Sequence, residues 1–184
     1  MTANAFLARI VALLDAANIP CMVSGCVAST YHGVPRATQD LDVVIDPTDA
    51  ALANFAQAAL KNDLYVDPDR AREALRQRRQ FNVIDATSGW KADLIVRKDR
   101  PFSREEFSRR VHARLLDVDV WVATPEDTVL AKLEWSARGG SDLQMEDVAG
   151  IVRVRAQDLD RVYIRRWAAE LGVLEIWERV AGQS

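Results

Sequence analysis

The sequence has few of the residues that build disulfide-rich or zinc-stabilised domains. Among its 184 residues the only cysteines are Cys21 and Cys26, too few for a disulfide framework. The two histidines, His32 and His112, have no zinc-ligand spacing relative to these cysteines. No apolar run reaches about 18 residues, and no basic segment precedes a long apolar one. We therefore expect a soluble cytoplasmic protein with no membrane partner.

An excess of positive charge is also missing. The 24 basic and 27 acidic residues give a net charge of −3, which argues against a general nucleic-acid coat. Five arginines lie within residues 69–80, a segment that we expect to be a charged, solvated helix rather than an RNA-binding one. Apolar residues make up 49% of the chain, so a packed core is expected.

The hydrophobic pattern changes character near residue 124. Before it, apolar runs of strand length alternate with amphipathic segments of helical period, whereas the remainder is helical throughout. Thr124-Pro125-Glu126-Asp127 is a strong helix start, because it combines a cap, a proline at the first position and acids in the first turn. We expect an α/β (α+β) core over 1–123 and a C-terminal helical region over 124–184. Expected helices cover 3–18, 26–32, 48–60, 69–80 and 103–112, and expected strands cover 21–24, 40–46, 81–86, 90–96 and 115–123.

The stretch from residue 23 to residue 46 carries the main chemical signal. Gly25 stands between an expected strand and an expected helix, where a glycine lets backbone N–H groups approach a phosphate closely. Asp40 and Asp42 are at i and i+2 on a strand, so both side chains point to the same face. Two adjacent carboxylates are costly without a cation, and Mg²⁺ is commonly held by carboxylates and substrate phosphates. The pattern indicates a metal-dependent phosphate site.

A third carboxylate completes the predicted site. Asp93 is a lone acid in the apolar run Lys91–Val96, and a neighbouring strand would bring it beside Asp40 and Asp42. Three converging carboxylates would hold two Mg²⁺ ions. The similar Asp117-Val118-Asp119 lacks an upstream glycine turn, so we interpret it as a solvated strand face. Asp85 is interpreted as a structural acid of a hairpin around residues 87–89.

The order of these residues resembles the nucleotidyltransferase signature of the DNA polymerase beta superfamily. The signature residues are Gly25-Cys26, then thirteen intervening residues, Asp40-Leu41-Asp42 and the distal Asp93. GVPRATQDLD, residues 33–42, is similar to small bacterial members, including the minimal and abortive-infection type nucleotidyltransferases. Residues 124–133 and the helix around residues 147–148 also resemble the C-terminal part of that group, so the resemblance covers most of the chain.

The resemblance implies a mixed sheet flanked by helices and followed by a helical bundle. It also implies transfer of a nucleoside monophosphate from a nucleoside triphosphate to an acceptor, with release of pyrophosphate. Carried over by position, Gly25 and Cys26 would contact the triphosphate, Asp40 and Asp42 would hold Mg²⁺, and Asp93 would complete the metal site and activate the acceptor hydroxyl. Cys26 departs from the usual serine or glycine, and its thiol is a weaker donor than a hydroxyl.

Three further residues are candidates for the nucleotide site, each with a structural alternative. Arg36 binds the triphosphate in one interpretation and forms a salt bridge or a turn in the other. Thr38 orients the loop before Asp40 as an ST-turn. Lys132 reaches a phosphate in one interpretation and extends along its helix to solvent in the other.

Two other functions compete with a Mg²⁺-dependent nucleotidyltransferase. A catalytically degenerate nucleotide-binding or protein-interaction module on the same fold is favoured by the departure at Cys26. A cysteine hydrolase would need Cys26 paired with His32 and a third, orienting group. For the transferase, the acceptor is a small molecule, a protein or an RNA. A toxin–antitoxin or phage-defence role, with a cognate toxin or antitoxin partner, is consistent with the resemblance.

Overall fold

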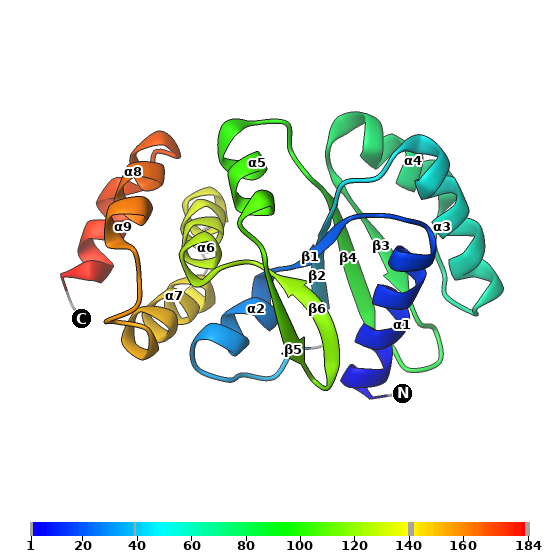
Figure 1. Ribbon diagram of the computed structural model, residues 1–184, viewed down its shortest axis with the longest axis horizontal. Coiled ribbons are helices and arrows are strands. Elements are labelled where there is room, and N and C mark those ends of the chain that lie inside the picture. Colours follow the sequence, from blue (N-terminus) through cyan, green and yellow to red (C-terminus); the bar gives the residue numbers. More distant parts are fainter. Residues whose placement is uncertain (1, 39, 140–141, 183–184) are drawn as a thin grey trace. The chain divides into compact units, whose positions relative to one another are not determined.

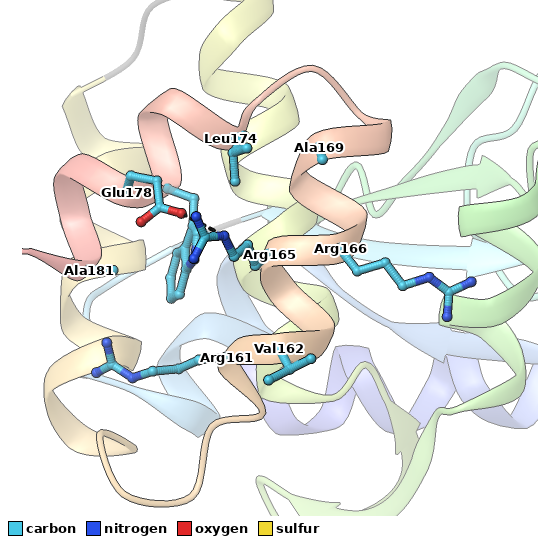
Figure 2. A pocket seen from close by; sticks show the side chains of 9 residues that line it. Arg161, Val162, Arg165, Arg166, Ala169, Leu174, Glu178 and Ala181 are labelled. Atoms are coloured by element: carbon cyan, nitrogen blue, oxygen red, sulfur yellow. Dashed lines mark ion pairs between the residues drawn. The ribbon is translucent and has the colours of Figure 1, made fainter.

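The structure is a computed structural model that describes residues 2–38, 40–139 and 142–182. Strands and helices are interspersed up to residue 122, and only helices follow among the described residues (Figure 1). In chain order the described elements are α1 (Ala3–Ala16), β1 (Cys21–Val23), α2 (Gly25–His32), β2 (Asp40–Ile45), α3 (Asp49–Lys61), α4 (Pro68–Gln77), β3 (Gln80–Ile84), β4 (Lys91–Val96), α5 (Pro101–Ser108), β5 (Val111–Leu115), β6 (Val118–Val122), α6 (Pro125–Gly139), α7 (Asp142–Val154), α8 (Arg161–Glu170) and α9 (Leu174–Ala181).

All described strands join one mixed sheet in the order β3-β4-β2-β1-β6-β5. The pairs β2–β4 and β1–β6 are parallel, and the other neighbouring pairs are antiparallel. The mixed sheet expected from the resemblance is therefore confirmed. In β2 the side chains of Leu41, Val43 and Ile45 are buried, which turns Asp40 and Asp42 to the opposite face because strand side chains alternate.

The chain divides into two compact units. The first comprises residues 1–23 and 38–122 and contains the sheet with α1, α3, α4 and α5. Within it α1 packs against β6 and α3, and α4 packs against α3 and β3 (Figure 1). Its core contains large side chains that are almost fully buried, among them Phe6, Ile10, Phe55 and Leu94.

The second unit comprises residues 24–37 and 123–184 and, over its described residues, is helical. Although α2 lies between β1 and β2 in the sequence, it packs against α6 and α7. The helix α8 packs against α6 and α9. The start of α6 has the expected cap, because the Asp127 backbone N–H donates to Thr124 Oγ1 at 3.2 Å. The longer segment of this unit begins at Ala123, and residues 24–37 belong to the same unit.

The region 101–122 differs from the prediction. A helix was expected over 103–112 and one strand over 115–123, but α5 ends at Ser108 and β5 and β6 form a hairpin. Leu116 and Asp117 make its turn with φ of 48° and 62°. Such left-handed turns usually carry asparagine or aspartate followed by glycine, and Leu116 is unusual in one, so no turn was expected here. The start of α5 also differs, because Pro101 takes the first helical position and Ser103 lies inside the helix.

None of the helices within the described ranges is long and apolar enough to span a membrane.

Candidate functional site

The three predicted carboxylates lie together in the first unit. Because β2 and β4 are parallel and in register, Asp42 is the direct partner of Asp93, and Asp40 is the partner of Lys91. Directly paired residues on one sheet face have Cβ atoms about 5 Å apart. We call Asp40, Asp42 and Asp93 the acidic row. Its members differ in exposure, since the side chain of Asp93 is 13% exposed and that of Asp40 is 55% exposed.

A lysine neutralises part of the acidic row. Lys91 Nζ lies 3.3 Å from Asp40 Oδ1 and 3.4 Å from Asp93 Oδ1, so one ammonium bridges carboxylates from two strands. Burial lowers the pKa of Lys91, but the charges of Asp93 and Asp40 raise it by more, and its net pKa is above the ordinary value. Lys91 is therefore a cation at neutral pH.

An asparagine extends the acidic row onto a third strand. Asn82 of β3 pairs with Asp93 in the antiparallel β3–β4 register, and its amide Nδ2 donates to Asp93 Oδ1. Sequence analysis missed Asn82, although it stands between the apolar Phe81 and Val83 in a strand of period two. The pairing of Asn82 with Asp93 was not evident from the sequence, because the turn was expected at residues 87–89. In the structure the Asp85 backbone N–H donates to the Trp90 carbonyl at 2.9 Å, and the turn falls at residues 86–88.

The donor chemistry of the acidic row suits a hard divalent cation. Carboxylate and amide oxygens from Asp40, Asp42, Asp93 and Asn82 are the ligand types that Mg²⁺ prefers. In the arrangement described, however, no group of three or more His, Cys, Asp or Glu residues is shaped as a metal-ligand cluster in the described part of the chain. The Lys91 ammonium instead holds a cation position between Asp40 and Asp93.

Thr38 shapes the approach to the acidic row. Its Oγ1 accepts a hydrogen bond from the Asp40 backbone N–H at 3.2 Å and also lies 3.2 Å from the Asp40 carbonyl oxygen. This is the predicted ST-turn, which fixes the backbone where β2 begins.

The other four predicted site residues belong to the second unit. Gly25, the first residue of α2, has φ of 57°, a left-handed conformation that suits glycine. The preceding residue, Ser24, makes no side-chain capping hydrogen bond to α2. The backbone N–H groups in the first turn of α2 therefore donate no hydrogen bond to the Ser24 side chain. Uncapped N–H groups at the start of a helix favour binding of an anion.

Arg36 and Lys132 converge on Asp147, which sequence analysis did not select as a site residue, and Cys26 joins them through Arg36. Arg36 Nε donates to Asp147 Oδ1 at 2.9 Å, and Lys132 Nζ lies 2.6 Å from Asp147 Oδ2. Arg36 Nη2 also donates to Cys26 Sγ at 2.6 Å. The Lys132 side chain is only 4% exposed, so it does not extend to solvent as one interpretation held. We call these four residues the Asp147 network.

The two cations set the charge state of the Asp147 network. Burial raises the pKa of Asp147, but hydrogen bonds from Arg36 and Lys132 lower it by more, and its net pKa is below the ordinary value. The Arg36 pKa is raised, chiefly by its hydrogen bond to Asp147. With Asp147 ionised, two cations face one carboxylate, so these three charged groups carry a net charge of +1.

A cysteine–histidine nucleophilic pair is not formed. His32 Nε2 donates to the Ala123 carbonyl at 2.7 Å, and His32 Nδ1 has no hydrogen-bond partner among the described residues. Burial lowers the pKa of His32, so its imidazole is held neutral with the proton on Nε2. Because His32 does not contact Cys26 through either nitrogen, the geometry argues against the cysteine hydrolase.

The remaining acids and arginines have structural roles. Asp85 accepts hydrogen bonds from Thr87 N at 2.9 Å and Ser88 Oγ at 2.8 Å, the hairpin role expected of it. Asp117 lies in the β5–β6 turn, where its side chain is 84% exposed. The arginines of α4 form ion pairs with nearby acids, as a solvated helix does; examples are Arg72 with Asp69 and Arg76 with Glu73.

The fold is that of solved nucleotidyltransferases, although no family model and no curated protein matches the sequence. The antibiotic-resistance factor ANT(2'')-Ia aligns with a TM-score of 0.62 and 12% identity over 96% of each chain. An antigenic nucleotidyltransferase-like protein from Paracoccidioides brasiliensis gives a TM-score of 0.58 and 16% identity, over 91% of this chain and 86% of that one. The lincosamide antibiotic adenylyltransferase LnuA gives 0.51 and 10%, over 84% and 98%. These likenesses confirm the expected polymerase-beta-type fold.

Proposed function

We propose that the chain is a Mg²⁺-dependent nucleotidyltransferase that moves a nucleoside monophosphate from a nucleoside triphosphate to an acceptor hydroxyl. One observation carries the proposal: Asp42 and Asp93 are direct partners on adjacent strands, with Asp40 two residues away, in a sheet of nucleotidyltransferase fold. Three ionised carboxylates on one sheet face repel one another and lower the stability of the fold. We therefore assign them the role of binding a positively charged ligand.

In this proposal the acidic row divides the chemical work. Asp40 and Asp42 would hold Mg²⁺ and Asp93 would complete the metal site, and the bound ion would supply positive charge to the triphosphate. Asp93 takes the proton of the acceptor hydroxyl, and its hydrogen bond from Asn82 fixes the orientation of its carboxylate. The acceptor oxygen forms a bond to the α-phosphorus as the bond from the α-phosphorus to the bridging oxygen breaks. Pyrophosphate leaves with that oxygen.

Contacts to the triphosphate are proposed for the residues that the sequence pattern selected. Gly25 and Cys26 offer backbone N–H groups at the first turn of α2, where the helix dipole favours anions. Arg36 and Lys132 supply the positive charge of the Asp147 network. Thr38 contributes by holding the backbone at Asp40 rather than by binding phosphate through its hydroxyl.

The acceptor belongs to one of three classes: a small molecule, a protein or an RNA. ANT(2'')-Ia has been solved with adenylyl-2''-tobramycin, and the lincosamide antibiotic adenylyltransferase LnuA with lincomycin. This likeness supports testing small molecules first. A protein or RNA acceptor would fit the toxin–antitoxin or phage-defence role, with a cognate toxin or antitoxin as partner.

Nucleotide binding is the first test. Each of the four nucleoside triphosphates is titrated by calorimetry, with and without Mg²⁺, into the wild type, Asp42→Asn and Asp119→Asn. Asp119 is the matched control, because it is an exposed aspartate on β6 that also belongs to an Asp-x-Asp sequence. We expect Mg²⁺-dependent binding of at least one nucleotide that Asp42→Asn abolishes and Asp119→Asn keeps. Equal binding by all three proteins would contradict the proposal.

Transfer is tested with the nucleotide that binds. The protein is incubated with the α-³²P-labelled nucleotide, Mg²⁺ and, separately, aminoglycosides and lincosamides, total protein or total RNA. We expect label in one acceptor class and pyrophosphate in equal amount, both reduced at least about a hundredfold by Asp93→Asn, since a positioned base contributes about 10²–10⁴-fold.

A binding module without transfer is the second candidate. It is favoured by Cys26, whose sulfur takes a hydrogen bond from Arg36 where the signature usually has serine or glycine. For such a module the calorimetric titration gives nucleotide binding without Mg²⁺, and no acceptor becomes labelled. Replacing Cys26 with serine would then restore Mg²⁺-dependent binding if the cysteine is the cause of the lost activity.

A further inference from the structure

The acidic row contains a cation of its own. Lys91 and Asp93 are two residues apart on β4 and lie on one face, and Asp40 is the register partner of Lys91 on β2. The Lys91 ammonium is within 3.4 Å of carboxylate oxygens of both Asp40 and Asp93.

The position of the Lys91 ammonium is the one that a divalent ion would need. A divalent ion held by the acidic row would need the Asp40 and Asp93 carboxylate oxygens that the Lys91 ammonium now faces. The Lys91 side chain is 35% exposed and has four rotatable methylenes, so it can leave without moving the backbone. The exposed position of Asp40 gives an incoming ion access to the same oxygens.

We propose that Lys91 is the resident counter-ion of the acidic row and competes with the divalent ion for Asp40 and Asp93. This inference rests on the metal site of the proposed function. It makes Lys91 a positioning residue: it keeps the carboxylates together before the metal binds, and it weakens metal binding because its charge must first be displaced.

Removal of the competing charge should tighten metal binding. A unit charge about 4 Å from another contributes at least about 1 kcal/mol even in water, and more near a protein surface, which corresponds to an affinity gain of about fivefold or more. Lys91→Met removes the charge and keeps the length of the stem. Lys91→Arg keeps a charge that reaches both carboxylates, so we expect no gain in affinity from it.

The experiment measures Mn²⁺ binding to the nucleotide-free protein by electron paramagnetic resonance of the free ion. The proteins are the wild type, Lys91→Met, Lys91→Arg and Lys61→Met, each with and without Asp42→Asn. Lys61 is the matched control, an exposed lysine at the end of α3 that also loses one positive charge. We expect Lys91→Met to bind Mn²⁺ at least about fivefold more tightly than the wild type and Lys61→Met.

The outcomes separate the inference from the proposed function. Binding that Asp42→Asn abolishes but that is equal in the wild type and Lys91→Met would overturn the role of Lys91 and leave the metal site intact. Absence of Asp42-dependent binding in every protein would overturn both. A gain shared equally by Lys61→Met would show a general charge effect and would also contradict the competition.

Thermal unfolding supplies a second readout without enzyme activity. Without metal, Lys91→Met leaves the acidic row less neutralised, so we expect its melting temperature to fall below that of the wild type. Added Mn²⁺ should then raise its melting temperature more than that of the wild type, because a ligand that binds the folded state more tightly stabilises it more. An equal rise in the two proteins would contradict the proposal.

Discussion

At the scale of single residues, His32 shows how burial converts a titratable side chain into a structural one. Its Nε2–H donates to the Ala123 carbonyl at 2.7 Å, while its Nδ1 lies buried without a hydrogen-bond partner in the part of the chain that the structure describes. Protonation would place a charged N–H at Nδ1 with nothing to accept it. Burial is therefore the main cause of its lowered pKa, and nearby Arg155 adds to it, while Ala123 and Glu126 act in the opposite direction.

The lowered pKa predicts a pH dependence of stability. Because the folded-state pKa lies below the ordinary 6.5, the unfolded chain takes up the proton first as the pH falls. The contribution of His32 is complete above about pH 6.5 and is lost as the pH drops toward the folded-state pKa, with a slope of at most about 1.4 kcal/mol per pH unit.

The measurement is the free energy of unfolding in urea at pH 8 and at pH 5.5. His32→Gln keeps a donor for the Ala123 carbonyl but cannot titrate, so we expect a smaller loss of stability between the two pH values than in the wild type. His112→Gln, at an exposed position of β5, is the control and should keep the wild-type loss. An identical loss in His32→Gln would mean that another group causes it.

The residue scale also shows what the sequence could predict about the site. The proximity of Asp40, Asp42 and Asp93 was predictable because strand alternation and a lone acid in an apolar run are local signals. Asp147 was not selected as a site residue because its importance arises from Arg36 and Lys132, which are far from it in sequence. Long-range ion pairs leave no local pattern, so only the fold could reveal this partner.

At the scale of elements, the packing of α2 depends on one glycine at its end. A Cβ built on Gly33 would lie 2.8 Å from the backbone N of Ile151 and 3.0 Å from the backbone C of Gly150, both in α7. Backbone atoms of a helix cannot move aside as a flexible side chain can. Gly33 is thus the residue that lets the end of α2 approach α7 closely.

This close approach predicts the effect of a single methyl group. We expect Gly33→Ala to destabilise the protein by about 1–3 kcal/mol, the usual cost of overpacking a well-packed contact. Gly139→Ala is the matched control, because nothing described lies within 4 Å of its added Cβ and it lies in the last turn of α6. The control should be neutral or slightly stabilising. Urea unfolding measures both, and equal stabilities would contradict the contact.

Most elements were predicted because their signals are local, and the exception is instructive. The helix α3 has bounds within about one residue of the expected 48–60, and α6 starts at the expected Thr124-Pro125, since caps and helical periodicity mark them. The strand β5 was missed because its exposed residues, such as His112 and Arg114, alternate with only two small or aliphatic buried ones. Pairing with β6 stabilises this strand, and that pairing is a tertiary effect.

At the scale of the whole molecule, the chain passes between its two units three times. It leaves the first unit after Val23, returns at Thr38 and leaves again after Val122. Sequence analysis expected a single change near residue 124, because composition changes there and the short segment 24–37 has no distinguishing composition. The helix α2 buries Ala28, Ser29 and His32, and the helices it packs against, α6 and α7, begin about a hundred residues later.

This topology predicts that one cut cannot separate two folded parts. A fragment of residues 1–123 keeps every described strand but loses α6 and α7, the helices against which α2 packs. The side chains that α2 buries against them would then be exposed to solvent. We expect the fragment to bind the dye ANS strongly and to unfold without a cooperative transition, whereas the full chain unfolds cooperatively. The control fragment replaces residues 24–37 with a short Gly-Ser linker between Val23 and Thr38, which removes the uncovered helix while retaining the sheet unit. If the linker fragment unfolds cooperatively and the 1–123 fragment does not, α2 depends on the helical unit for its stability. Cooperative unfolding of both fragments would contradict this prediction.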